Sequence, residues 1–296
     1  MSVYSFIDER HLLFYSTVMS AGERESTYVL DGLVHQNSDP NHMHSTDTHG
    51  YSELIFGLMH LLGLDYAPRI KNFQRQRLYA FKGLRKQEAY ASFLIKPHGA
   101  VNTQLIYTHW EDILRFVATL KLRVTTPSEL FRRLNSYSSQ HGLYRALKAF
   151  GQILKSHFLL RYLDDVELRQ QITQQLNKVE QSHRLARALS VGTSREFLSV
   201  EKDDQEVEEG CKRLMKNAVT CWNYVYLSQR LMQTGDPGQQ RLLVDAIRHG
   251  SPISWQHINL LGEYDFSDER LEDSVGILPA TWMTEQEHIL TEVLRP

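Results

Sequence analysis

An alternation of strand-like and helix-like segments over the first 70 residues constrains the fold most strongly. Apolar, β-prone segments alternate with segments whose apolar residues recur at helical spacing. Strands are expected at 12–19, 42–47 and 66–70, and helices at 25–35 and 52–62. This order of strand, helix, strand, helix and strand predicts an α/β region.

The remainder of the chain is predicted to be mainly helical. Residues 71–104 are irregular, whereas 110–189 have helical periodicity with breaks near Pro127 and at 136–142. A second helical block is expected over 206–232. The chain shows no internal repeat, so a repeat architecture is excluded.

Length and cysteine content restrict the class of protein. The chain has 296 residues, enough for a sizeable core without disulfides. Its two cysteines, Cys211 and Cys221, provide neither a disulfide framework nor a four-cysteine zinc site, and we expect both in or near the core. No apolar run is long enough to cross a bilayer, and no leader-like pattern begins the chain. We therefore expect a cytoplasmic protein that has no membrane partner.

Charge is segregated along the chain although the formal total is only −2. Residues 69–187 carry 21 basic and 8 acidic side chains, whereas 201–209 hold six acids and one lysine. The tail from Glu263 has a net charge of −7. A basic middle region suits a polyanion such as nucleic acid. The alternative, ordinary solvated helix faces, stays open on charge alone.

Common catalytic motifs are absent from the sequence. His42, His44, His49 and His60 fit no standard structural zinc spacing, and no cysteine lies near them. Walker A, G-x-G-x-x-G, G-x-S-x-G and H-E-x-x-H patterns do not occur. Nucleotide-dependent hydride transfer and serine hydrolysis therefore lack a local signature.

Asp47 is the first candidate for a functional carboxylate. It follows a predicted strand and precedes Thr48-His49-Gly50 and a helix. Carboxyl ends of strands face the ligand crevice of open α/β sheets, where a carboxylate can hold Mg²⁺. Asp47 could instead cap the following helix, and from spacing alone this capping role is favoured.

Glu180 is the second candidate. It lies at the edge of an apolar stripe that includes Leu176 and Val179, and Arg184 and Arg187 follow on the same side. A carboxylate beside the core and flanked by arginines could face an active site next to a phosphate backbone. A surface pair between Glu180 and Arg184 explains the same spacing and is favoured when the helix is considered alone.

Six segments share their order and spacing with one family. They are TYVLDGLVH (27–35), HSTDTHGYSELIFGLMHLLG (44–63), YAPRIKN (66–72), LNKVEQSHRLARAL (176–189), NAVTCWNYVYLS (217–228) and SPISWQHINLLGEYDF (251–266). Together they resemble the carboxyl-terminal catalytic region of the Tn-three family of replicative transposases, over roughly residues 3–266. The resemblance implies an α/β fold with a partial ribonuclease-H-like core, a large mostly helical insertion at about 71–160 and carboxyl-terminal helices. Residues 267–296 would be a diverged acidic tail.

The resemblance also implies a chemistry. The family uses an Asp-Asp-Glu triad and two Mg²⁺ (or Mn²⁺) ions for phosphoryl transfer, cleaving and joining DNA strands at transposon ends. Asp47 matches the second Asp and Glu180 matches the Glu, which makes both residues expected catalytic and metal-binding groups. The expected partners are double-stranded DNA and further transposase chains, in a bacterial cytoplasm at the nucleoid. The expected contacts to DNA are His49, Arg69, Lys71, Arg75, Arg77, Arg85, Lys86, Lys178, Arg184 and Arg187.

Two departures from the family pattern affect these expectations. Val179 replaces the glycine that usually precedes the Glu. The family's first Asp lies upstream of the segment where this chain begins, so we expect a truncated copy that is inactive alone; Asp8 and Asp31 do not occupy that motif. Alternatives are a non-catalytic DNA-binding or transposase-partner remnant, and an unfolded relic.

Overall fold

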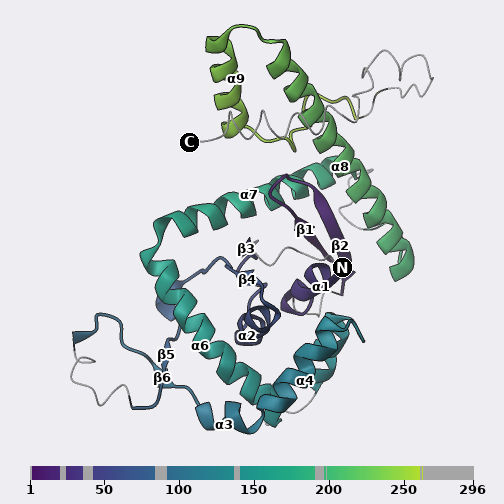
Figure 1. Cartoon of the computed structure of the whole chain (residues 1–296). Coiled ribbons are helices and arrows are strands. Elements are labelled where there is room, and N and C mark those ends of the chain that lie inside the picture. Colours follow the sequence, from purple (N-terminus) through teal and green to yellow (C-terminus); the bar gives the residue numbers. More distant parts are fainter. Residues whose placement is uncertain are drawn as a thin grey trace. The chain divides into compact units, whose positions relative to one another are not determined.

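The structure is a computed structural model that describes residues 2–20, 25–35, 43–83, 92–136, 141–190, 197, 199–260 and 262. Within these residues the chain is a mixed α/β protein, mostly helical, with small sheets (Figure 1). Met1–Trp255 form one compact unit, and Gln256–Pro296 form a second. None of the helices in the described part is both long and apolar enough to cross a membrane.

The predicted alternation over the first 70 residues is confirmed, with one strand added before it. The elements are β1 (Ser2–Ile7), β2 (Leu13–Met19), a 3-10 helix (Glu25–Thr27), α1 (Val29–His35), β3 (Met43–His44), α2 (Glu53–Leu62) and β4 (Asp65–Tyr66). Strand β1, whose alternating pattern is short, was not predicted. β1 pairs antiparallel with β2, while β3 and β4 pair in parallel.

Short irregular elements and then long helices follow, as the sequence predicts. They are a 3-10 helix (Phe73–Arg75), β5 (Tyr79–Ala80), β6 (Gly99–Ala100), α3 (Thr103–Thr108), α4 (Trp110–Lys121), α5 (Pro127–Ser136), α6 (Gly142–Asp164), α7 (Val166–Leu189), α8 (Lys202–Gln233) and α9 (Pro237–His249). The break between α6 and α7 was not predicted: Asp165 ends one helix and caps the next by accepting from the backbone N–H of Leu168 at 2.9 Å. Helix α9 was not predicted either.

Helices α2 and α6 form the centre of the main core. Helix α2 buries Ile55, Phe56, Leu58 and Met59, and Phe56 lies 5.4 Å from the ring of Phe158 on α6. The two backbones approach closely where a glycine of α6, Gly151, faces the first turn of α2. A Cβ atom at Gly151 would lie 1.6 Å from the carbonyl oxygen of Glu53. Only glycine fits there, so this contact sets the distance between the two helices.

Both ends of α2 are fixed by local sequence. Ser52 is the N-cap and accepts from the backbone N–H of Ile55, and Gly63 ends the helix with a φ of 80°. The predicted end at Gly63 is confirmed. The alternative that Asp47 caps this helix is wrong, because the helix begins six residues later, at Glu53.

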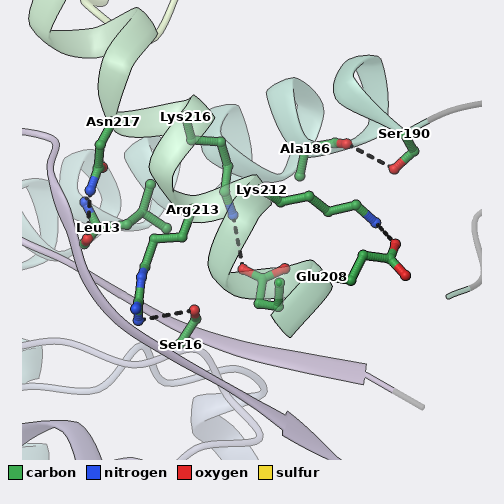
Figure 2. Close-up of polar contacts among 10 residues, drawn as sticks. Leu13, Ser16, Ala186, Ser190, Glu208, Lys212, Arg213, Lys216 and Asn217 are labelled. Atoms are coloured by element: carbon green, nitrogen blue, oxygen red, sulfur yellow. Dashed lines mark hydrogen bonds and ion pairs between the residues drawn. The ribbon is translucent and has the colours of Figure 1, made fainter. Parts of the chain in front are cut away.

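Helix α8 packs against β2 through polar side chains. Asn217 accepts from the backbone N–H of Leu13 and donates to its carbonyl oxygen, both at 2.9 Å, and Arg213 donates to the hydroxyl of Ser16 (Figure 2). Cys211 and Cys221 are exposed on this helix, so the expectation that they lie in or near the core is wrong. The face they occupy points away from β2.

Candidate functional site

The candidate site is the tight turn that carries Asp47 beyond the end of β3. The backbone N–H of Gly50 donates to the carbonyl oxygen of Asp47 at 3.0 Å, which closes the turn. The side chains of Asp47 and His49 are exposed. Asp47 accepts one hydrogen bond, from the hydroxyl of Thr48 at 3.3 Å. The carboxylate is therefore presented to solution by a fixed backbone.

A tyrosine from the neighbouring strand holds this turn in place. The Tyr66 hydroxyl lies 2.8 Å from the hydroxyl of Thr46 and donates to the carbonyl oxygen of Gly50 at 3.2 Å. A Cβ atom at Gly50 would lie 2.7 Å from the Thr46 side chain, so the turn is also tightly packed from inside. Sequence analysis did not identify Tyr66 as a site residue. Its place in the strand that pairs with the Asp47 segment was the available signal.

Buried groups next to the turn have shifted protonation equilibria. Burial raises the pKa of Tyr4 on β1, and the negative charges of Glu25 and Asp47 raise it further. Burial lowers the pKa of His44 to about 4, so its imidazole is neutral near pH 7. His44 stacks between the rings of Phe6 and Tyr66. The groups packed behind the Asp47 turn are thus uncharged near pH 7, and the charge of Asp47 lies on the exposed side.

The parallel pairing of β3 and β4 brings basic residues next to Asp47. The backbone N–H of Ala67 donates to the carbonyl oxygen of His44, and that of Arg69 donates to the carbonyl oxygen of Thr46, each at 2.9 Å. These bonds continue the parallel ladder beyond the strands. The predicted basic segment begins at Arg69, which bonds to Thr46, the residue before Asp47. The segment therefore starts beside Asp47 on the neighbouring strand.

The basic side chains of this segment point to solution. Exposed residues among the predicted DNA contacts are Arg69, Lys71, Arg75 and Arg77. Among the ion pairs of the described residues, none involves these four side chains. Arg85 and Lys86 lie outside the described residues. Within the described part of the chain, the segment that begins at Arg69 thus carries four positive charges that form no ion pair there.

Glu180 lies on α7 and forms a surface ion pair with Arg184, the alternative that the spacing of the two residues also allowed. Its carboxylate accepts from Arg184 at 2.7 Å, and the side chains are 61% and 57% exposed. Such an exposed pair contributes about 0.3–0.5 kcal/mol. Arg187 is exposed on the same helix, and Lys178 donates to the carbonyl oxygen of Glu9 at 3.0 Å. Lys178 therefore fastens α7 to the turn between β1 and β2.

The described carboxylates do not fit a metal ion as they stand. A two-metal site needs several oxygen ligands that converge on the ions. No group of three or more His, Cys, Asp or Glu side chains that could hold a metal occurs within the described ranges. Asp47 is open, whereas Glu180 is engaged by Arg184. The parallel ladder places the backbone of Arg69 next to the Asp47 segment, and among the described residues neither Asp47 nor Glu180 belongs to a group of three or more potential metal ligands.

Comparisons with known proteins agree with the sequence resemblance. The family model described as "Tn3 transposase DDE domain" matches residues 1–264. A transposase for transposon Tn501 from Pseudomonas aeruginosa is 37% identical over 275 residues, which cover 91% of this chain and 27% of that protein. A transposase for transposon Tn1546 from Enterococcus faecium is 34% identical over 282 residues, covering 94% of this chain and 28% of that protein.

A third relative, the transposase for transposon gamma-delta from Escherichia coli, is 32% identical over 265 residues. These residues cover 89% of this chain and 26% of that protein. The chain thus spans about a quarter of the length of the curated relatives it matches. The family model, in contrast, matches all but the last 32 residues of the chain. The chain therefore belongs to the Tn3 transposase DDE domain family.

Proposed function

We propose that this chain acts in DNA transposition, as part of the catalytic region that cleaves and joins DNA strands at transposon ends. The observation that carries this proposal is the family match over residues 1–264. The site geometry supports it, because the exposed Asp47 turn lies next to an exposed run of basic side chains. A DNA backbone on that run would pass close to the carboxylate.

The basic segment provides the DNA contacts in this proposal. Its guanidinium and ammonium groups bind phosphate oxygens and position the duplex without reading its sequence. His49, in the same turn as Asp47, is exposed and able to contact a flanking phosphate. Arg187 on α7 offers a further charge of the same sign.

Asp47 and Glu180 are the carboxylates proposed for catalysis. Mg²⁺ or Mn²⁺ bound by such carboxylates would stabilise the charge that develops during phosphoryl transfer. Asp47 and Glu180 would need further ligands to hold such an ion, because the described residues contain no group of three or more potential metal ligands. The chain itself provides the carboxylate oxygens of Asp47 as ligands. They are held on a turn that hydrogen bonds from Tyr66 keep rigid.

A second candidate function is DNA binding without catalysis, alone or together with other transposase chains. The specific observation in its favour is that the described residues contain no three-ligand carboxylate group. The exposed basic segment serves this function equally well. The proposed catalytic function also includes the expected fold, a ribonuclease-H-like domain over 1–266 with a mostly helical insertion at about 71–160.

DNA nicking tests whether the chain is catalytic by itself, and DNA binding tests both functions. The chain is incubated with DNA and Mg²⁺ or Mn²⁺ beside two variants, Asp47→Ala and Asp245→Ala, the second carrying the same change on α9. We expect DNA to be bound by all three proteins and to be nicked by none of them beyond background. Nicking that is lost only in Asp47→Ala would show that the chain is catalytic by itself. Absence of any DNA binding at low salt would contradict both functions.

A further inference from the structure

Helix α8 has its polarity reversed relative to an ordinary surface helix. Every fully buried residue that it contributes is polar: Gln205, Glu209, Lys216, Thr220 and Asn223. At the same time several of its apolar side chains are largely exposed, including Val207 at 67% and Leu214 at 71%. The helix therefore meets its own domain with a polar face and presents an apolar face to solution.

The reversal has a cause in the contacts of the buried face. Backbone groups of β2 are satisfied by α8 side chains: Asn217 binds Leu13, and Glu206 accepts from the backbone N–H of Val18 at 3.0 Å. Lys216 and Glu209 form an ion pair at 3.1 Å within the same buried layer. Because the edge of β2 requires polar partners, the apolar residues of α8 are left on the opposite side.

These apolar residues have the spacing of a coiled-coil seam. Val207, Cys211, Leu214, Ala218, Cys221 and Val225 recur at alternating intervals of four and three residues. We call these six residues the α8 seam. Met215 and Trp222, which are 45% and 41% exposed, border it on one side. A continuous apolar strip of this kind on a surface is typical of a protein interface.

The α8 seam is self-complementary when it is reversed. Suppose that two copies of the helix pack antiparallel about a point midway between Leu214 and Ala218. Val207 of each copy then faces Val225 of the other, and Cys211 faces Cys221. The large Leu214 then meets the small Ala218. A two-fold axis requires such pairing, since residue i contacts j and j contacts i.

Charge along the helix favours the same antiparallel direction. Residues 201–209 hold six acids and one lysine, whereas 210–233 hold four basic residues and no acid. A parallel copy would place the six acids of one helix beside those of the other, whereas in the antiparallel register 201–209 lies opposite 223–231, which holds Arg230 and no acid. Antiparallel helix dipoles also attract.

We propose that the α8 seam is a homodimer interface, in which α8 packs antiparallel against α8 of a second copy of this chain. The seam from Val207 to Val225 is about 27 Å long, which is short for a coiled coil. We therefore expect a dimer of modest affinity, with a Kd on the order of micromolar. This inference concerns assembly and does not depend on the proposed action on DNA.

Sedimentation velocity of the full chain over about a hundredfold concentration range tests the interface. Leu214→Asp places an unpaired charge in the centre of the seam and should weaken dimerisation by about a hundredfold or more. The matched control is Leu242→Asp on α9, because Leu242 is 72% exposed and Leu214 is 71% exposed. The control should dimerise like the parent chain. Circular dichroism verifies that both variants remain folded, as the exposure of both leucines predicts.

The two cysteines report the direction of packing. With a mild thiol oxidant, the antiparallel register joins Cys211 of one copy to Cys221 of the other, forming a disulfide-linked dimer. Cys211→Ser and Cys221→Ser should then each abolish cross-linking without reducing sedimentation as a dimer. In a parallel dimer each single variant would still cross-link through its remaining cysteine.

Three results would overturn the proposal. They are a chain that stays monomeric at all concentrations, a dimer that tolerates Leu214→Asp, and a dimer whose single-cysteine variants still cross-link. A monomer whose Cys211 and Cys221 also resist a thiol reagent would show that another part of the chain covers the seam.

Discussion

The imidazole of His44 is neutral in the folded chain because burial disfavours its charged form. Its Nε2 atom is buried and has no hydrogen-bond partner among the described residues, and its pKa is lowered from 6.5 to about 4. The unfolded chain takes up this proton below about pH 6.5, whereas the folded chain does so only below about pH 4. Stability is therefore present above pH 6.5 and is lost as the pH falls toward 4.

Replacing His44 with phenylalanine should remove this pH dependence. His44→Phe keeps an aromatic ring between Phe6 and Tyr66 and has no proton to bind. The loss of unfolding free energy between pH 6.5 and 4 should be about 3 kcal/mol smaller in the variant than in the parent. Urea unfolding at several pH values measures this difference. His11 and His183, whose pKa values are also lowered, are present in both proteins and cancel in the comparison.

At the scale of helices and strands, the close contact of α2 with α6 should be the most sensitive packing feature. Gly151→Ala forces a Cβ atom into the carbonyl of Glu53 and should lower the free energy of unfolding by about 3 kcal/mol. Gly210→Ala on α8 is the matched control, because nothing lies within 4 Å of its Cβ position. The control should be stabilised by about 0.5–1 kcal/mol. Equal effects of the two changes in thermal unfolding would contradict the described packing.

The buried pair of Lys216 and Glu209 should behave differently from the exposed pair of Glu180 and Arg184. Lys216→Met leaves Glu209 charged and unpaired in a buried layer and should cost about 3–5 kcal/mol of unfolding free energy. Combining it with Glu209→Leu should restore most of that loss. Glu180→Gln on α7 should cost less than about 1 kcal/mol. A double-mutant cycle by denaturant unfolding measures the coupling, and additive single effects would show that the pair is not formed.

Local patterns were sufficient to predict some elements and not others. Helix α2 was predictable because its apolar run, its Ser52 cap and its Gly63 end all lie within a dozen residues. The polar burial of α8 was not predictable, because it depends on the edge groups of β2, some 200 residues away. The same holds for Cys211 and Cys221, which helical periodicity alone placed in or near the core.

The candidate site was also only partly predictable. Sequence resemblance singled out Asp47, but the proximity of Arg69 to it follows from the parallel pairing of two very short strands. Tyr66, which holds the turn, has no motif of its own. For Glu180, the surface pair with Arg184 was the favoured interpretation of the helix considered alone, and the structure has that pair.

At the scale of the whole molecule, the segregated charge should give salt-sensitive and sequence-tolerant DNA binding. Changing Arg69, Lys71, Arg75 and Arg77 to Ala removes up to four phosphate contacts. The slope of log K against log salt should fall in magnitude by about 3–4. Fluorescence anisotropy with DNA duplexes of unrelated sequence measures both slopes. The control changes Lys202, Arg230, Arg241 and Arg248, which lie on α8 and α9, and should leave the slope nearly unchanged.

We expect bound DNA to lie against the Asp47 turn and the basic segment beside it. An iron chelate attached at position 47, in an Asp47→Cys chain whose Cys211 and Cys221 are serine, generates radicals that cut any nearby DNA backbone. The control carries the chelate at position 242 on α9, through Leu242→Cys in the same background. Bound DNA should be cut strongly from position 47 and weakly from position 242. Cuts of equal strength from both positions, or none from position 47 when DNA is bound, would contradict it.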